Sequence, residues 1–468
     1  MTGKLILVTG ATGYIASRLV PRLLEQGYNV RCMARSPGSL HGRPWSSGVE
    51  VVQGELKNEA GLEKALAGVW TAYYLIHNLS SGRGYTAREL EGAHSFAKAA
   101  AVAGVEHIIY LGGLADPRAH IAAHLRSRIQ TGDALRSGPV PVTEFRAGVI
   151  VGPGSISFEM IRFMTELFPV VPGPAWMKNW SQPIAASNVL DYLTAALENP
   201  EGRGGIFEIG GPAVLRYSEL MLEYARLRGL KRRMFTFPYI PLWLMAFGIG
   251  LTSPVPRRIA YALIDGLRSD SRVQEPAARR AFPAVDLIPY GQAVQHSLRL
   301  LHPDSVQPVW RDSGRQAVEM RHEGFFISHR SLHVVAPPQR VFETVTRLAR
   351  EPAWLYAHGL WRFRARLNAL LPKHGKPADQ GLPQIYQVEA EEPEARLLLH
   401  AEMQFPGEGW IEWRLRQEGK GTRLSQTGFF APRGLPGFLY WYASYPGHAL
   451  AFHGLIRAIA KEAATAHP

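Results

Sequence analysis

The sequence predicts a doubly wound parallel α/β sheet with a small substrate lobe, followed by a smaller α+β domain built on an antiparallel sheet. Three observations support this. Strand-like and helix-like segments alternate through residues 5–152, a glycine-rich turn follows the first strand, and closely spaced strands fill residues 384–431 before one last helix. The chain has 468 residues, 46% of them hydrophobic, which suits two or three globular domains.

The alternation begins at the N-terminus. Residues 5–10 (LILVTG) have the pattern of a short apolar strand that ends in glycine, and residues 16–27 place leucine and valine at helical spacing. The pattern continues with helices at 59–69 and 86–104 and with strands at 28–35, 49–56, 71–78, 105–113 and 140–152. Because strands and helices alternate, we expect parallel strands covered by helices on both faces.

The chain is expected to divide into three parts. We predict a cofactor domain over 1–310 with its substrate lobe at about 153–300, a linker at 308–322 and a second domain over 323–468. The second domain begins with a long strand at 325–335 and a helix that Pro337 and Pro338 open. Its other predicted elements are a long apolar terminal helix, a helix at 353–371, and strands at 384–391, 394–404, 409–418 and 421–431.

Residues 10–16 (GATGYIA) carry the clearest local pattern, because they follow a strand and open a helix. Gly10 permits the tight turn, Gly13 lets the backbone approach a pyrophosphate, and the N–H groups at the helix N-terminus face the phosphates. A purely structural turn is the alternative. The residues expected to contact a dinucleotide here are Gly10, Thr12, Gly13, Tyr14 and Ile15.

The ends of the next strands predict the cofactor's other contacts. NAD enzymes place a carboxylate after the second strand, but Arg35 and Ser36 stand there and suit a 2′-phosphate, so we expect NADP(H) to be favoured over NAD(H). A solvated strand end is the alternative for Arg35. We expect adenine contacts from Gly54, Glu55 and Leu56, and contacts beneath the nicotinamide ribose from Leu75, Ile76 and His77. His77 is expected to be a loop contact rather than a proton donor.

Residues 1–300 resemble the atypical, extended-like branch of the short-chain dehydrogenase/reductase superfamily, which has a Rossmann-type fold. GATGYIA is similar to its GxxGxxA fingerprint, and residues 145–153 (FRAGVIVGP) are similar to the strand and loop that close over nicotinamide. Residues 183–189 and 207–211 look like its substrate-domain helix and the following strand. The resemblance implies NAD(P)H binding and oxidoreductase activity.

The sequence departs from this superfamily at the catalytic residues. The usual reductase pairs Tyr with Lys four residues later, and none of the 17 tyrosines here has such a lysine. Gly112 lies where a Ser or Thr would follow the fifth strand. His124 and Arg128 lie on one helix face where Tyr and Lys would stand, so they are the candidate catalytic residues, with Arg128 also a candidate cofactor contact. Ordinary packing is the alternative for His124.

The C-terminal 150 or so residues resemble a domain of unknown function with a START-like (SRPBCC) helix-grip outline. The similarity is strongest over 397–459, where Trp410, Glu412 and Arg414 alternate with Ile411, Trp413 and Leu415. The resemblance implies a pocket for an apolar small molecule or lipid. A solid core is the alternative.

Composition restricts the partners and the compartment. The net charge is +13 but is spread along the chain, which favours a solvated surface, and we expect no nucleic-acid partner. Cys32 is the one cysteine, so the sequence excludes an intrachain disulfide, and we expect no metal site. No secretory pattern precedes the first strand, which predicts a cytoplasmic protein.

Residues 234–256 and 434–456 contain no Asp, Glu, Lys or Arg and reach the length of a membrane span. Pro238 and Pro241 interrupt the first stretch, and Pro446 is expected to break a helix in the second, so we expect neither to span. Burial at a domain interface and peripheral contact with the inner face of a membrane, through aromatic residues flanked by arginine, both stay open.

The favoured function is NADPH-dependent reduction of an apolar or lipid-like substrate near a membrane. A non-catalytic NADPH-sensing or assembly protein, as among NmrA-like relatives, is the rival. An isomerase or epimerase with a tightly held cofactor is the third alternative.

Overall fold

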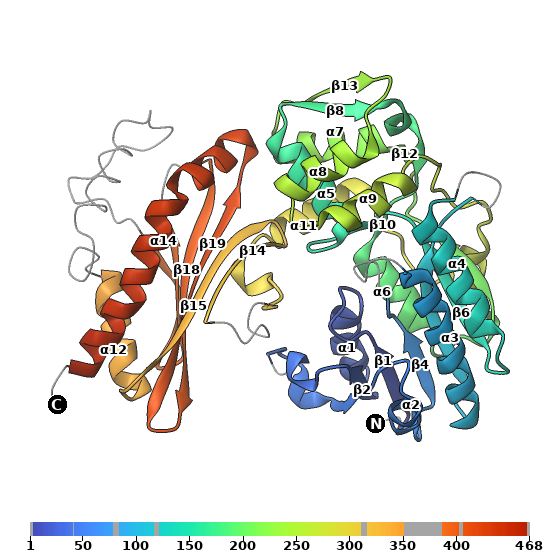
Figure 1. The fold of residues 1–468 in the computed structure, drawn as a ribbon, viewed down its shortest axis with the longest axis horizontal. Helices are drawn as coiled ribbons and strands as arrows, with labels where there is room; N and C mark the ends of the chain where they lie inside the picture. Colours follow the sequence, from blue (N-terminus) through green and yellow to red (C-terminus); the bar gives the residue numbers. More distant parts are fainter. Residues whose placement is uncertain are drawn as a thin grey trace. The chain divides into compact units, whose positions relative to one another are not determined.

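The computed structural model describes residues 3–40, 42–77, 84–116, 121–309, 316–350, 386–401 and 406–465. The chain divides into two compact units. The N-terminal unit comprises Met1–Leu300 with Gln307–Ser313, and the C-terminal unit comprises Leu301–Val306 with Gly314–Pro468. Each unit is described by itself below (Figure 1).

A seven-stranded parallel sheet organises the N-terminal unit. Its strands, in spatial order, are β11 (Ile206–Ile209), β6 (Val142–Ala147), β5 (His107–Gly113), β4 (Thr71–Tyr74), β1 (Leu5–Thr9), β2 (Asn29–Ala34) and β3 (Glu50–Gln53). The strand order therefore reverses between β1 and β4. In such sheets, ligands bind outside the carboxyl ends of the strands at this reversal. The predicted doubly wound parallel sheet is confirmed for this unit.

Helices cover both faces of this sheet, as predicted. Successive residues of a strand point to opposite faces, so Ile6 and Val8 enter one core and Leu7 enters the other. Leu19 and Val189 cover the first face. The helices are α1 (Ala16–Glu25) and α6 (Ala186–Ala195) on that face, and α2 (Glu59–Leu66), α3 (Tyr85–Val102) and α4 (Ala123–Arg136) on the other.

A lobe follows β6 and carries its own apolar core around Phe158, Leu220 and Tyr224. Its helices are α5 (Ile156–Leu167), α7 (Tyr217–Arg228), α8 (Leu242–Thr252), α9 (Arg257–Gly266), α10 (Ala277–Ala281) and α11 (Tyr290–Arg299). Its short strands are β7 (Ile150–Val151), β8 (Val170–Pro174), β9 (Trp180–Ser181), β10 (Ile184–Ala185), β12 (Leu215–Arg216) and β13 (Arg233–Phe237).

The C-terminal unit is a six-stranded antiparallel sheet. In spatial order its strands are β14 (Ala317–His322), β15 (Phe325–Val334), β19 (Gly421–Pro432), β18 (Gly407–Glu418), β17 (Arg396–Ala401) and β16 (Tyr386–Glu392). Helices α12 (Pro338–Arg350) and α14 (Gly434–Thr465) pack on each other and on this sheet (Figure 1).

The structure of this unit differs from two of the predictions made from the sequence. The last six residues of the predicted linker 308–322 are strand β14, which forms because it pairs with β15 over its whole length. Helix α14 runs through Pro446, where we predicted a break. Buried Phe438 and Trp441 precede the proline, and buried Leu455 and Ile459 follow it, so packing on both sides offsets the lost backbone hydrogen bond. The predicted helix at 353–371 lies outside the described residues.

Length and apolarity together decide whether a helix can cross a membrane. Among the described residues, no helix meets both conditions. Residues 234–256 form β13, a proline-containing turn and α8 instead of one long helix.

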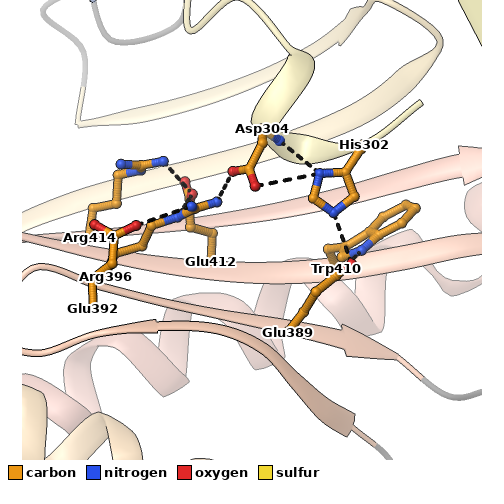
Figure 2. Close-up of polar contacts among 8 residues, drawn as sticks. All are labelled: His302, Asp304, Glu389, Glu392, Arg396, Trp410, Glu412 and Arg414. Atoms are coloured by element: carbon orange, nitrogen blue, oxygen red, sulfur yellow. Dashed lines mark hydrogen bonds and ion pairs between the residues drawn. The ribbon is translucent and has the colours of Figure 1, made fainter. Parts of the chain in front are cut away.

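A buried ionic network joins residues 301–306 to the C-terminal sheet (Figure 2). Arg396 of β17 donates from Nε to Glu412 Oε1 at 2.8 Å, and its guanidinium also contacts Asp304. Beside it, Nε2 of His302 lies 3.0 Å from Glu389 Oε1, and Trp410 Nε1 donates to Glu389 Oε2 at 2.8 Å. The segment that enters the unit is therefore held by side chains of three strands.

Candidate functional site

A cavity of about 480 Å³ opens at the carboxyl ends of β1, β2, β3 and β4. This is the position that the strand order indicates for a ligand. The structure brings most of the predicted cofactor residues together in its lining: Gly10, Thr12, Gly13, Arg35, Ser36, Gly54, Glu55, Leu56, Leu75, Ile76 and His77. Of the remaining predicted residues, Ile15 precedes α1 and packs against the sheet core. Tyr14, Gly112 and Arg128 line a second cavity.

The glycine turn lies close to the backbone of the neighbouring strand end. Gly10 adopts a left-handed conformation with φ of 65°. A Cβ at Gly10 would lie 2.8 Å from the carbonyl oxygen of Leu75, which is too close for any side chain. The N–H of Gly13 donates to Gly10 O at 2.8 Å and closes the turn before α1. The first helix thus begins at the cavity with its N–H groups directed toward it.

Cations surround this cavity. Arg35 is exposed at the end of β2, and Lys57 and Arg88 also line the cavity, against one carboxylate from Glu55. Three cations and one carboxylate suit a ligand with several phosphates. The sequence did not predict Lys57 and Arg88 as cavity residues. Lys57 lies just before α2 and Arg88 lies within α3, and only the packing of these helices brings the two side chains to the cavity.

Arg31 lies in β2, four residues before Arg35, but it does not line this cavity. It donates to the carbonyls of Ala65 and Ala67 at 2.9 and 2.7 Å and pairs with Glu50. Its charge therefore neutralises the carbonyl end of α2 instead of reaching a 2′-phosphate.

A second cavity of about 280 Å³ lies beside the first, and His77 lines both. Its wall is mainly apolar and comes from the strand ends and the lobe, including Leu114, Val149, Ile150, Met160, Ile161 and Leu263. Its polar groups include Tyr14, His77, His124, Arg128 and Asp270. The two cavities thus share one histidine, His77.

His77 is held by a buried carboxylate. Its Nδ1 lies 2.9 Å from Oε1 of Glu89, on α3, and Ser127 Oγ, on α4, donates to Oε2 of the same carboxylate at 2.5 Å. Burial is the largest influence on the pKa of His77 and lowers it, and the charge of Arg128 adds to this. Glu89 acts in the opposite direction. Sequence analysis missed Glu89 and Ser127, because their meeting depends on how α3 packs against α4.

His124 and Arg128 lie together on α4, as their spacing predicts. Among the described residues, His124 Nδ1 has no hydrogen-bond partner, and burial lowers the pKa of His124 to about 4. Arg128 Nη1 donates to Leu111 O at 3.2 Å, which fixes the guanidinium beside the end of β5. Arg128 therefore contributes a fixed positive charge, and His124 a neutral ring, to the second cavity.

The described part of the C-terminal unit holds a smaller cavity. Aromatic residues of β18, β19 and α14, among them Trp410, Phe429, Trp441 and Phe452, surround a cavity of about 40 Å³. That volume accommodates little more than water, whereas ligand pockets usually measure about 300–1,000 Å³. The apolar ligand expected for this unit stays a prediction.

Two family models match the chain. The NmrA-like family matches residues 2–184, and a protein of unknown function (DUF2867) matches residues 324–455. The second match carries no START-like description, so that feature also stays a prediction.

Individual proteins match the N-terminal unit. The chain is 29% identical over 289 residues to (4-alkanoyl-5-oxo-2,5-dihydrofuran-3-yl)methyl phosphate reductase of Streptomyces griseus, covering 60% of this chain and 91% of that protein. Citrobacter triphenylmethane reductase complexed with NADP(H) superposes with a TM-score of 0.51 at 20% identity, covering 62% and 99%. NADPH-dependent quinone oxidoreductase of Escherichia coli, complexed with NADPH, gives 0.51 at 16% identity, covering 63% and 99%. The chain is therefore similar to the NmrA-like family over residues 2–184, and it shares the fold of these two reductases.

Proposed function

We propose that this protein is an NADP(H)-dependent reductase that acts on an apolar substrate. One observation carries the proposal: the phosphate-suited cavity and the apolar cavity meet at His77. A reductase needs this arrangement, because hydride transfer requires the two ligands to lie in contact. The NADP(H) and NADPH complexes of the two structural neighbours support the same cofactor class.

The lining of each cavity suits a different part of the reaction. NADPH, when bound, supplies a hydride. Gly10 lets the turn pack against the Leu75 carbonyl, Gly13 lets the backbone approach a pyrophosphate, and Arg35 supplies positive charge for a 2′-phosphate. In the second cavity the apolar wall excludes water, and Arg128 stabilises negative charge that develops on a substrate oxygen.

Cofactor preference provides the first test. We expect NADPH to bind at least tenfold more tightly than NADH, and Arg35→Asp to remove most of that difference. Arg280→Asp makes the same charge change at an exposed position in α10, outside both cavities, and should leave the ratio unchanged. Equal affinities for the two cofactors in the wild type would contradict the NADP(H) preference.

Turnover provides the second test. Deuterium transfer from 4-deuterated NADPH would be followed to 2-methyl-1,4-naphthoquinone, trans-cinnamaldehyde and 2-decanone, which are apolar electrophiles of different classes. Label in any product supports a reductase. Exchangeable NADPH with no transfer favours the sensor or assembly role, and cofactor that stays bound through purification favours an isomerase or epimerase.

We further propose peripheral contact of this reductase with the inner face of an anionic membrane. Eight large apolar side chains are exposed in one part of the lobe: Phe235, Phe237, Tyr239, Trp243, Leu244, Phe247, Leu251 and Tyr261. Tyr239 is 79% and Trp243 65% exposed. Residues 224–264 also contain seven Lys or Arg and no Asp or Glu. Two of these cations, Arg226 and Arg228, pair with Glu223 and Glu166. Exposed aromatic rings beside the remaining excess of positive charge favour an anionic lipid surface as the partner.

Vesicle flotation tests this contact. We expect salt-sensitive binding to vesicles that contain phosphatidylglycerol, weaker binding to neutral vesicles, and loss of binding in Trp243→Glu. Val102→Glu introduces the same charge at an exposed apolar residue of α3 outside this surface and should bind like the wild type. Absence of binding at low salt would contradict the proposal and favour burial of this surface against the C-terminal unit.

A further inference from the structure

We infer that His77 donates the proton that accompanies hydride transfer, and that Glu89 and Ser127 are positioning residues that orient its ring. This inference rests on the proposed reductase function and gives the reaction the acid that the missing Tyr-x-x-x-Lys pair would otherwise supply. The sequence favours a simple loop contact for His77. The contact of Nδ1 with Glu89 and the absence of a described partner on Nε2 favour a proton donor instead.

Three separate elements converge on this group. His77 follows β4, Glu89 lies in α3, and Ser127 lies in α4. The carboxylate of Glu89 is buried, with one oxygen 2.9 Å from His77 Nδ1 and the other 2.5 Å from Ser127 Oγ. A buried carboxylate must have polar partners, and here both of its oxygens have one. The arrangement is that of an acid–base residue, His77, whose ring is oriented by a carboxylate that a third group holds in place.

The carboxylate determines which nitrogen of His77 can exchange a proton. An ionised Glu89 accepts a hydrogen bond, so the proton of a neutral His77 lies on Nδ1. Nε2 is then the nitrogen that gains and loses a proton. Among the described residues, Nε2 is buried and has no hydrogen-bond partner. His77 also lines both the cofactor cavity and the apolar cavity, so its ring lies where the two ligands would meet.

Other ionisable groups near His77 fit this role less well. His124 is buried without a partner on Nδ1, so nothing described orients its ring. Tyr110 donates from its hydroxyl to Arg128 O at 3.0 Å, and burial raises its pKa. Burial also raises the pKa of Tyr74 and of Tyr85, which lie on β4 and α3. Among these described groups, His77 is thus the one with both an orienting carboxylate and a ring nitrogen that lacks a hydrogen-bond partner.

The proton balance of the step is simple. An electron-poor carbon of the substrate would receive the hydride that a bound nicotinamide cofactor supplies, which reduces the substrate by two electrons. The N–H bond at protonated His77 Nε2 breaks, and the proton forms a new bond to the substrate oxygen. His77 is left neutral, with Nδ1–H still donated to Glu89, and takes up a proton from water before the next cycle.

The environment of His77 sets the expected pH profile. Burial and Arg128 lower the pKa of His77 despite Glu89, so the protonated form is depleted as pH rises through a value below 6.5. We therefore expect the hydride-transfer rate to fall with rising pH above that value. The nearby anion of Glu89 favours the protonated ring of His77, so its removal lowers the pKa of His77 further. Glu89→Gln should therefore move the fall in hydride-transfer rate to lower pH.

Single-turnover reduction of 2-methyl-1,4-naphthoquinone and trans-cinnamaldehyde by NADPH, measured against pH, tests the inference. We expect His77→Gln and His77→Asn to slow transfer by about 10²–10⁴-fold, the usual effect of losing a general acid, and to abolish the pH-dependent fall. Their NADPH affinities, measured by fluorescence, should stay within a few-fold of the wild type. His77→Asn retains an amide donor near the Nδ1 position and so preserves the contact with Glu89.

The outcomes separate this inference from the proposed function. Turnover with an unchanged rate and pH profile in both His77 variants overturns the inference alone, and loss of the pH-dependent fall in His124→Gln would assign the role to His124. A wild type that binds NADPH but reduces nothing overturns the reductase function as well. Nitrogen NMR of the resting protein must also find the Nδ1–H tautomer of His77, and finding Nε2–H would overturn the inference without any turnover measurement.

Discussion

The two units place buried charge in different surroundings. In the N-terminal unit, His77, His124 and Arg128 line a cavity of about 280 Å³. In the C-terminal unit, Arg396 is buried, but its guanidinium contacts Glu412, Asp304 and Glu392, and the aromatic cavity described above measures about 40 Å³. Carboxylates of the protein itself therefore accept the hydrogen bonds of the Arg396 guanidinium.

This difference shows that a buried ionisable group is not by itself a site. Arg396 and its carboxylates neutralise one another within the sheet, so they stabilise the attachment of residues 301–306 (Figure 2). His77 has one nitrogen satisfied by Glu89 and the other without a partner among the described residues, so it retains capacity for a ligand. Unused hydrogen-bonding capacity beside open space distinguishes the two regions.

The largest expected effect concerns the buried network. Arg396→Met removes the buried cation from Glu412, which keeps only the more exposed Arg414 at 2.8 Å. Removal of one partner from a buried pair typically costs about 3–5 kcal/mol. Because Arg414 remains, we expect a loss at the lower end of this range, about 3 kcal/mol, in the free energy of unfolding of the C-terminal unit. Chemical denaturation, followed by hydrogen exchange of the strands β15 to β19, would measure it.

A surface pair provides the matched control. Arg423 contacts Glu418 at 2.9 Å on the same sheet, but both side chains are substantially exposed. Arg423→Met should cost less than about 1 kcal/mol. The double variant Arg396→Met with Glu412→Leu should recover part of the stability, because it removes the buried pair and leaves only the half-exposed Arg414 without its carboxylate. Equal losses for Arg396→Met and Arg423→Met would remove the contrast between the two units.

Much of the fold could be predicted because its determinants are local. The strand and helix periods indicate the parallel sheet, and Gly10 indicates the turn, since few other residues tolerate a φ of 65°. Strand β14 and the continuity of α14 through Pro446 could not be predicted, because pairing with β15 and packing on the sheet decide them.

The candidate site divides in the same way. Residues at strand ends, such as Arg35 and His77, could be placed because the carboxyl ends of parallel strands meet at one edge. Glu89, Ser127 and Arg88 come from helices, where nothing in the sequence shows which face turns toward the cleft. The role of His77 depends on Glu89, so sequence analysis could locate that histidine but not see what orients it.

The next largest expected effect concerns how the stability of the N-terminal unit depends on pH. His107 and His124 are buried, and burial lowers the pKa of each to about 4. The unfolded histidines take up protons near pH 6.5 and the folded ones only near pH 4, so stability is lost as pH falls through this window. At pH 5 the loss should reach about 2 kcal/mol per histidine, since one pKa unit corresponds to about 1.36 kcal/mol.

Urea unfolding at pH 7 and pH 5 would measure this loss. His107→Gln and His124→Gln should each reduce the difference between the two pH values. His296→Gln removes an exposed histidine of α11 and should leave that difference unchanged. If all three variants keep the full pH dependence of the wild type, the buried histidines do not cause it.

The smallest expected effect concerns two glycines of the N-terminal unit. Gly10 and Gly68 have similar backbone conformations, with φ of 65° and 70°, so alanine strains both by about 1 kcal/mol. Only at Gly10 does the added Cβ meet another group, the Leu75 carbonyl oxygen at 2.8 Å, whereas nothing lies within 4 Å at Gly68. We expect Gly10→Ala to lose about 1 kcal/mol more stability than Gly68→Ala and to weaken NADPH binding, which Gly68→Ala should leave intact. Equal NADPH affinities in the two variants would show that the turn at Gly10 does not need close approach of the backbone, and the assignment of this cavity to the pyrophosphate would then be wrong.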